Sequence, residues 1–223
     1  ARHRLSKLLL RHGQVYYGGA AWTGKHDMWL RGEARGALPD GGTKLAFDAG
    51  YETVRMVLAR RDGLDKQIAT MAVESQYAPV VARLGCLRGI STLTGFALAV
   101  EIGDWQRMTG RTIGSFVGLT PSEHSSGASR SQGPITKTGN GHVRRLLIEA
   151  AWHHRAHYTI GSTLRARWDA APAAARARGD DGNRRLHKRW VSFIDRKKRS
   201  TVANTAIARE LAGWCWSLAV MDQ

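Results

Sequence analysis

The stretch LGCLRGISTLTGFALAVEIGDW, residues 84 to 105, contains two apolar segments separated by a short turn. The first segment is the end of a helix, Arg88 to Ser91 form the turn, and a second helix is expected from about Thr92 to Ile102. This is the outline of a helix-hairpin-helix, in which the turn and the second helix N-terminus bind a phosphate. The outline is imperfect because Ser91 stands where a second glycine is usual. We therefore expect Arg88 to contact a nucleic-acid backbone, with a plain helical hairpin as the alternative.

Helical patterns also dominate on both sides of this stretch. From Thr43 to about Val81, apolar residues recur at three- and four-residue intervals, as in a coiled coil or an antiparallel helix pair. No segment alternates in the manner of a strand, so the sequence predicts an all-α fold. We expect a linker and coiled-coil-like long-helix segment at residues 1–82 and a compact helical domain at residues 83–223.

The long helix also bears on oligomeric state. Its apolar stripe consists of Val54, Val57, Leu64, Ile68 and Met71. An exposed stripe of that length seeks a partner, which predicts a homo-oligomer, a dimer or higher. The alternative interpretation is that the long helix pairs with another helix of the same chain.

Three local patterns lead to further structural predictions. Thr120, Pro121 and Glu123 have the spacing of a capping box, which predicts a short helix ending at Gly127. A helix is expected from His142 to about Thr159. Residues 170–182, AAPAAARARGDDG, have the composition of a mobile connector before a very basic helix.

Charge is the strongest signal in the composition. The 223 residues carry 34 Lys and Arg against 18 Asp and Glu, a formal net charge of +16. Most of the excess lies between residues 130 and 200, which hold seventeen Lys or Arg and five Asp or Glu. A soluble protein with this excess is expected to bind a polyanion, and nucleic acid is the leading candidate.

The same composition argues against several other classes of protein. Cys86 and Cys215 are the two cysteines, so neither a disulfide framework nor a four-cysteine zinc site is possible, and a reducing cytosol is expected. No run of eighteen apolar residues, signal peptide or phosphate-binding P-loop is present, so we expect no membrane partner, no secretion and no ATP-driven activity. The chain opens inside an expected helix, ARHRLSKLLLRHG, which suggests that an upstream part is missing.

Residues 121–147, PSEHSSGASRSQGPITKTGNGHVRRLL, are the candidate site. A serine in such a loop can attack a DNA phosphate if cations and amide donors neutralise the charge that develops. The available cations are Arg130, Lys137, Arg144 and Arg145, and His124 is the nearest group that can accept the serine proton. On spacing alone, a loop that contacts phosphate without chemistry is the commoner outcome.

A metal site is the weaker alternative. Glu149, His153 and His157 are spaced four residues apart and would share one face of a helix. They span more than two turns and lack a fourth ligand, so we predict no metal site in this chain.

Residues 84–152 closely resemble the transposase domain of the insertion-sequence one-ten family, whose sisters are one-sixteen and nine-oh-two. These transposases are bridge-RNA-guided serine recombinases. The resemblance rests on an ordered set of short motifs: Gly118, Leu119 and Pro121; Ser126 and Gly127; Ile135 and Lys137; Gly139 and Asn140; Arg144 and Leu147 ahead of EAAW. Residues 203–216 and the opening helix are similar to the family more loosely, so the likeness covers nearly the whole chain.

This resemblance implies a DNA recombinase whose serine becomes covalently joined to DNA. Ser126 holds that position, with Ser125 as its neighbour, while Arg130 and Lys137 would neutralise the phosphate and Asn140 would add neutral donors. Family members also carry a RuvC-like domain in which four acidic residues hold a divalent metal, expected to be magnesium. That domain is absent here, so we expect this chain alone to bind DNA without cutting it.

The resemblance also implies partners. Double-stranded DNA is the expected substrate and a structured RNA the expected guide. The alternative is a basic helical module that binds DNA or RNA without chemistry.

Overall fold

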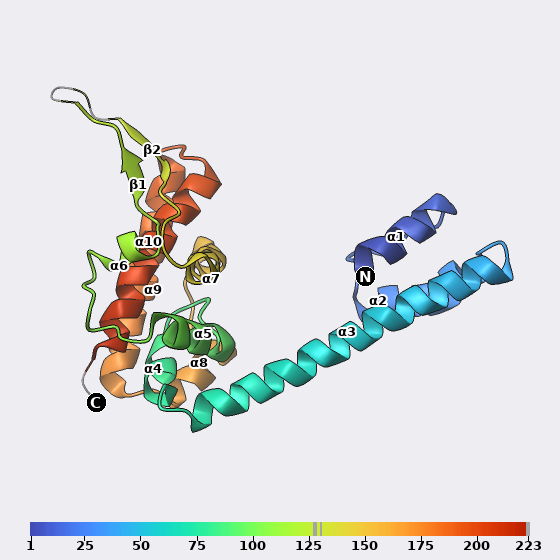
Figure 1. The fold of residues 1–223 in the computed structure, drawn as a ribbon, viewed down its shortest axis with the longest axis horizontal. Helices are drawn as coiled ribbons and strands as arrows, with labels where there is room; N and C mark the ends of the chain where they lie inside the picture. Colours follow the sequence, from blue (N-terminus) through green and yellow to red (C-terminus); the bar gives the residue numbers. More distant parts are fainter. Residues whose placement is uncertain (127–128, 130, 222–223) are drawn as a thin grey trace. The chain divides into compact units, whose positions relative to one another are not determined.

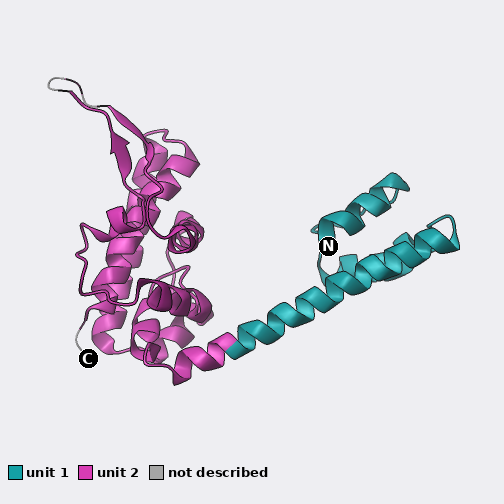
Figure 2. Cartoon of the chain, viewed as in Figure 1, with its two compact units in different colours: residues 1–67 teal, residues 68–223 magenta. Residues whose placement is uncertain are grey.

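The structure is a computed structural model that describes residues 1–126, 129 and 131–221, and it is predominantly helical (Figure 1). The chain divides into two compact units, Ala1–Gln67 and Ile68–Gln223 (Figure 2). The all-α fold class is confirmed, because the described residues contain a single two-stranded sheet among their helices. None of the described helices is both long and apolar enough to cross a membrane. The predicted domain boundary at residue 82 stays a prediction.

The first unit is built around the N-terminal half of a long helix. Helix α1 (Arg2–Arg11), helix α2 (Gly24–Trp29) and the π-helical η1 (Leu30–Ala34) pack with α3 (Gly41–Glu74) around a small core. Leu5, Leu30, Phe47 and Val54 are the main apolar residues of that core. Asp40 fixes the start of α3, because one of its carboxylate oxygens accepts a hydrogen bond from the Thr43 backbone N–H at 2.7 Å.

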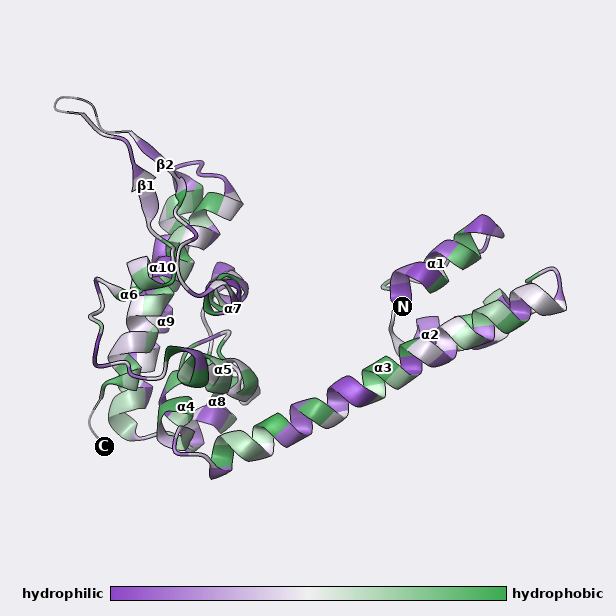
Figure 3. Cartoon of the chain, in the orientation of Figure 1, coloured by the Kyte–Doolittle hydropathy of each residue, from purple (hydrophilic) through white to green (hydrophobic). Residues whose placement is uncertain are grey.

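The predicted long helix is confirmed as α3, although it ends at Glu74. The chain turns at residues 75–77 and α4 (Ala78–Leu84) begins with a proline in its first turn, where a missing N–H does not cost a helical hydrogen bond. Val57, Leu64 and Met71 are 53 %, 48 % and 57 % exposed, so much of the apolar stripe faces solvent. Figure 3 shows that hydrophobic residues recur along α3. Self-association through this stripe stays a prediction.

The second unit is a helical bundle around its last helix, α10 (Ser200–Ala219). Helix α10 packs on α9 (Ala173–Asp195), α7 (Gly141–Ala151), α4 and α6 (Ile113–Phe116), while α5 (Thr92–Ile102) packs on α4 and α7. Arg83 of α4 is buried and donates to the carbonyl oxygens of Leu218 and Ala219 at 2.8 and 2.9 Å. These bonds satisfy carbonyls that the end of a helix would otherwise leave unpaired.

The prediction of a mobile connector at residues 170–182 was wrong. Pro172 is the N-cap of α9, and residues 173–182 are its first turns. Their small residues allow close packing: a Cβ on Gly179 would lie 2.5 Å from the Cys86 Cβ, and one on Gly182 would lie 3.0 Å from the Trp214 ring. The Ala and Gly content therefore serves helix packing and not flexibility.

The prediction of a short helix from Pro121 to Gly127 was also wrong within the described residues. Strand β1 (Pro121–Glu123) pairs antiparallel with β2 (Gln132–Ile135), with Pro121 opposite Ile135 and Glu123 opposite Gln132. The backbone N–H of Thr136 donates to the carbonyl of Thr120 at 2.9 Å and continues the pairing. Pairing across the hairpin thus outweighs the local capping pattern.

The helix predicted from His142 to Thr159 is shorter than expected. Helix α7 ends at Ala151 and passes into the 3₁₀ turn η2 (Trp152–Arg155), after which α8 (Ser162–Asp169) leads to α9. His154 of η2 is completely buried. Burial, together with the charge of Arg88, lowers the pKa of His154 from 6.5 to about 3.

This histidine makes the stability of the second unit dependent on pH. Its folded-state pKa lies below its unfolded value, so its contribution is complete above about pH 6.5 and is lost as pH falls toward 3. At pH 5 we expect a loss of about 2 kcal/mol in the free energy of unfolding, at 1.36 kcal/mol per pH unit. Urea unfolding at pH 7 and pH 5 measures this loss. The His154→Leu variant should lose less stability between these pH values, and an equal loss would contradict the assignment.

Candidate nucleic-acid interface

The two candidate serines lie at the tip of the hairpin formed by β1 and β2, which extends away from the helices of the second unit (Figure 1). Ser126 forms an isolated bridge with Ser129, whose backbone N–H donates to the Ser126 carbonyl at 2.6 Å. Both serines are exposed. The bridge to Ser129 thus holds the Ser126 backbone and leaves its side chain open to solvent.

Ser125 and Ser126 differ in what their hydroxyl groups contact. The Ser125 hydroxyl donates to a carboxylate oxygen of Glu123 and accepts from the backbone N–H of Ser131 at 3.1 Å. The Ser126 hydroxyl makes no hydrogen bond to any residue that the structure describes. Ser125 therefore stabilises the hairpin tip. Gly127 and Arg130, also predicted for this site, lie outside the described residues.

The base of the hairpin is fixed by Arg144. Its guanidinium donates to the carbonyl oxygens of Val117 and Thr138, both at 2.9 Å, and so ties the two ends of the hairpin to α7. The backbone N–H of Lys137 donates to the Gly118 carbonyl at 3.1 Å. Arg144 is half-buried, so the structure places it as a support for the hairpin.

Two glycines allow the segment before β1 and the segment after β2 to pass close to each other at the base of the hairpin. Gly118 and Gly139 have φ values of +66° and +70°, in the left-handed region that favours glycine. A Cβ on Gly118 would lie 2.2 Å from the Thr138 carbonyl oxygen, and one on Gly139 would lie 1.9 Å from the Phe116 carbonyl oxygen. Neither position has room for a side chain.

Asn140 begins α7 directly after this crossing. Its side-chain oxygen accepts hydrogen bonds from the backbone N–H groups of His142 and Val143, at 2.9 and 3.0 Å, as a helix N-cap. Its amide nitrogen donates to Glu101 at 2.5 Å, and Glu101 also contacts the His142 ring at 2.7 Å. The hydrogen bonds from His142 and Asn140 lower the pKa of Glu101. Asn140 thus shapes the start of α7.

Lys137 and Arg145 are the predicted cations that face solvent among the described residues of this region. Both side chains are exposed, and Lys137 also has a positive φ of +57°. Arg145 lies on the outer face of α7, whose inner face buries Val143 and Leu147. Because both side chains are exposed, either could contact a phosphate without breaking a contact that holds the hairpin.

Arg88 lies in a different environment from the hairpin. The helical hairpin of α4 and α5 is confirmed, but the Arg88 backbone N–H donates to the Asn183 side chain at 2.8 Å. The Arg88 guanidinium donates to the carbonyls of Ala156 and His157 at 3.1 and 3.2 Å, and burial lowers its pKa. Arg88 therefore holds the turn against the core, and phosphate binding there stays a prediction.

The alternative metal site has no support in the geometry. Because α7 ends at Ala151, His153 and His157 leave the helical register that would align them with Glu149. Across the part of the chain that the structure describes, no three His, Cys, Asp or Glu side chains come together in a way that could hold a metal ion. The described residues thus do not fit the divalent metal implied by the family resemblance.

Sequence reasoning missed the residues that build this region. Asn183 holds the turn at Arg88, Glu101 holds the N-cap of α7, and Glu123 contacts Ser125. Asn183 and Glu101 are distant in sequence from the residues that they hold, so no local pattern identifies them, whereas Glu123 lies two residues from Ser125. The spacing of Asn140 before an apolar helix was a usable N-cap signal.

Comparison with known proteins gives a consistent assignment. Residues 81–168 match the sequence model of the Transposase IS116/IS110/IS902 family. The chain is 31 % identical over 219 residues to a putative transposase, y4qE, of Sinorhizobium fredii, covering 98 % of this chain and 52 % of the relative. It is 27 % identical over 201 residues to the transposase for insertion sequence element IS1533 of Leptospira borgpetersenii, covering 89 % of this chain and 57 % of the relative.

A third relative covers a shorter part of the chain. The transposase for insertion sequence element IS1328 of Yersinia enterocolitica is 32 % identical over 137 residues, covering 60 % of this chain and 34 % of the relative. The chain spans about half the length of the first two relatives. The matched segment, residues 81–168, contains the hairpin, its two glycines and Arg144. By this segment and these relatives, the chain is similar to transposases, and its residues 81–168 match the IS116/IS110/IS902 family.

Proposed function

We propose that the chain is the DNA-binding and serine-bearing part of a transposase that cuts and rejoins DNA through a phosphoserine intermediate. The observation that carries the proposal is the presentation of Ser126 at the tip of a hairpin that extends from a basic helical unit. A nucleophile in that position can reach a phosphate on the surface of a duplex. Gly118, Gly139 and Arg144 fix the base of the hairpin, and this base positions the tip that carries Ser126.

The proposed step exchanges one ester for another. The Ser126 Oγ attacks the DNA phosphorus, the bond from phosphorus to the sugar oxygen breaks, and the sugar oxygen leaves with a proton. The serine proton passes to a base, and the phosphoserine ester keeps the bond energy for rejoining. Arg130, Lys137 and Arg145 would neutralise the charge that develops on the phosphate. His124 is the nearest histidine in the sequence that could accept the proton.

The proposal assigns no metal to the described residues. A divalent metal, expected to be magnesium, would lower the pKa of an attacking or leaving oxygen when supplied by other residues of the protein. The described residues contribute the serine, Lys137, Arg145 and the base of the hairpin. We further propose double-stranded DNA as the substrate and a structured RNA as the guide that selects it.

A non-catalytic module that binds DNA or RNA is the second candidate. It is favoured by the roles of Arg88, Arg144 and Asn140, which hold the fold together and are not free to contact a reacting phosphate. A supercoiled DNA substrate and a denaturing gel separate the two candidates. Protein covalently attached to DNA supports the transposase, whereas binding without any adduct in the whole encoded protein supports the binding module.

Binding itself should depend on Arg145 and on salt. Log K should fall linearly with log salt concentration, by about 0.9 for each phosphate contact on duplex DNA. The Arg145→Ala variant should bind all sequences more weakly and show a slope smaller by about 1, because phosphate contacts carry no sequence information. Fluorescence anisotropy at several salt concentrations measures both effects.

The adjacent arginine is the control for this experiment. Arg144→Ala should lower the free energy of unfolding by about 2 kcal/mol, because two carbonyls lose a charged donor. Arg145→Ala should leave thermal stability unchanged. Binding by the original chain that shows no salt slope would exclude the proposed contact with phosphates.

A further inference from the structure

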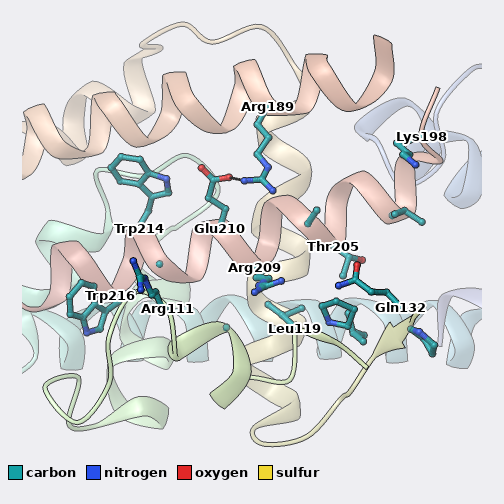
Figure 4. Close-up of a pocket in the computed structure, with 18 of the residues that line it drawn as sticks. Arg111, Leu119, Gln132, Arg189, Lys198, Thr205, Arg209, Glu210, Trp214 and Trp216 are labelled. Carbon is teal, nitrogen blue, oxygen red and sulfur yellow. Dashed lines mark hydrogen bonds and ion pairs between the residues drawn. The ribbon is translucent and has the colours of Figure 1, made fainter. Parts of the chain in front are cut away.

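A groove with a volume of about 1320 Å³ runs along α10 in the second unit (Figure 4). The base of the β1–β2 hairpin and the segment before α6 form one side, and residues of α9 and its end line the other. Leu119, Pro121 and residues 132–135 belong to both the groove wall and the hairpin. The groove therefore continues directly into the element that presents Ser126.

Cations line this groove at several points. Arg111, Lys198 and Arg209 are exposed, and they come from three separate segments of the chain. Arg178 lies over the Trp214 ring, 4.3 Å from its centre, and its Nε donates to the Ser217 hydroxyl at 3.2 Å. None of these arginines or lysines was predicted as a binding residue from the sequence motifs.

The negative charge in the groove is already neutralised. Glu210 is the acidic residue among the described residues that line it. One of its carboxylate oxygens lies 3.0 Å from the Arg185 guanidinium and the other 2.5 Å from that of Arg189. The groove thus has a net positive charge that suits a phosphate backbone.

The floor of the groove is partly apolar. Pro121, Pro134 and Val202 contribute to it, and Val202 is 54 % exposed. A duplex presents phosphates and polar base edges to a protein surface, whereas an unpaired strand also presents the apolar faces of its bases. A mixed lining of cations and apolar surface therefore suits a single strand better than a duplex.

We propose that this groove binds an unpaired DNA strand and leads it past the base of the serine hairpin. The inference rests on the proposed function, in which a cut strand has to be held until it is rejoined. Arg111, Lys198 and Arg209 would contact the phosphates, and Val202 would contact bases or sugars. The site is separate from Lys137 and Arg145, which do not line the groove.

The test is a binding measurement on the full 223-residue chain carrying Ser126→Ala, so that chemistry plays no part. The probes are fluorescent oligothymidine, a duplex hairpin and oligouridine. The groove variant combines Arg111→Ala, Lys198→Ala and Arg209→Ala. Its control combines Arg155→Ala, Arg165→Ala and Lys188→Ala, which remove the same charge from exposed residues outside the groove.

The groove variant should bind oligothymidine about tenfold or more weakly than the control variant. Its salt slope should be smaller by about 2, since each phosphate contact on a single strand contributes about 0.7. A second variant tests the floor without removing a cation. Val202→Asp places a carboxylate in the first turn of α10, where it does not destabilise the helix, and should weaken oligothymidine binding about tenfold through repulsion. Val191→Asp, on exposed α9 surface outside the groove, should change binding by less than about twofold.

Several results would overturn the inference. Equal binding by the groove and control variants, while the chain still binds oligothymidine, would remove the groove and leave the proposed function intact. An equal loss on the duplex would contradict the preference for a single strand. Tighter, groove-dependent binding of oligouridine would replace DNA with RNA as the occupant. A chain that binds none of the three probes would contradict the proposed function itself.

Discussion

Replacing Ser126 with alanine is expected to abolish the covalent protein–DNA adduct. The Ser126 hydroxyl is the proposed attacking group, and an alanine side chain has no atom that can form the phosphate ester. Removal of a nucleophile lowers the rate of such reactions by about a thousandfold or more. The hairpin should remain folded, because no described residue hydrogen-bonds with the Ser126 hydroxyl. Adduct formation on supercoiled DNA, followed on a denaturing gel with the chain and with the whole encoded protein, measures the effect.

The matched control is Ser125→Ala. Ser125 contacts Glu123 and the Ser131 backbone, so its loss should loosen the hairpin tip and reduce the adduct only in part. An adduct that survives Ser126→Ala and disappears with Ser125→Ala would assign the nucleophile to Ser125. An adduct that survives both substitutions would contradict the serine mechanism.

Replacing Gly139 with alanine should cause the largest loss of stability. The backbone there has a φ of +70°, and the new Cβ would lie 1.9 Å from the carbonyl oxygen of Phe116. That oxygen belongs to the backbone, so the hairpin base has to move. We expect a loss of about 3 kcal/mol in the free energy of unfolding, or a fall of about 6–12 °C in melting temperature.

Gly161→Ala is the control for this substitution. Gly161 precedes α8 in the same unit, has ordinary φ and ψ values of −74° and 170°, and has no atom within 4 Å of an added Cβ. Gly161 is the N-cap of α8, where alanine is less favourable than glycine, so its substitution should cost no more than about 1 kcal/mol. Equal melting temperatures for both variants would contradict this prediction, because they would show that the backbone near Gly139 and Phe116 can move apart at little cost.

Local pattern was sufficient where packing and propensity agree. The helix at 92–102 shows an apolar run between recognisable ends, and it formed as predicted. The long helix was predicted as well, although it ends at Glu74 and a separate helix begins at Ala78. Even the position of the serine segment, in a polar gap between helices, could be inferred from the sequence.

The errors arose where a distant contact decides the local structure. Pro121 forms a strand because Ile135 pairs with it. Residues 173–182 form a packed helix whose glycines contact Cys86 and Trp214, which are distant in sequence. The same reason limits the site prediction. Arg144 and Arg88 look like phosphate contacts in sequence, yet the carbonyls that each binds belong to other segments.

The central position of α10 has a consequence for synthesis of the protein. Helix α10 packs on α4, α6, α7 and α9, and its final carbonyls accept hydrogen bonds from Arg83. A ribosome makes this helix after all the helices it packs against, so the second unit has no complete core until α10 has been synthesised. The first unit contains no part of α10 and can fold on the nascent chain. Folding of the serine-bearing unit is thereby delayed until its last helix leaves the exit tunnel.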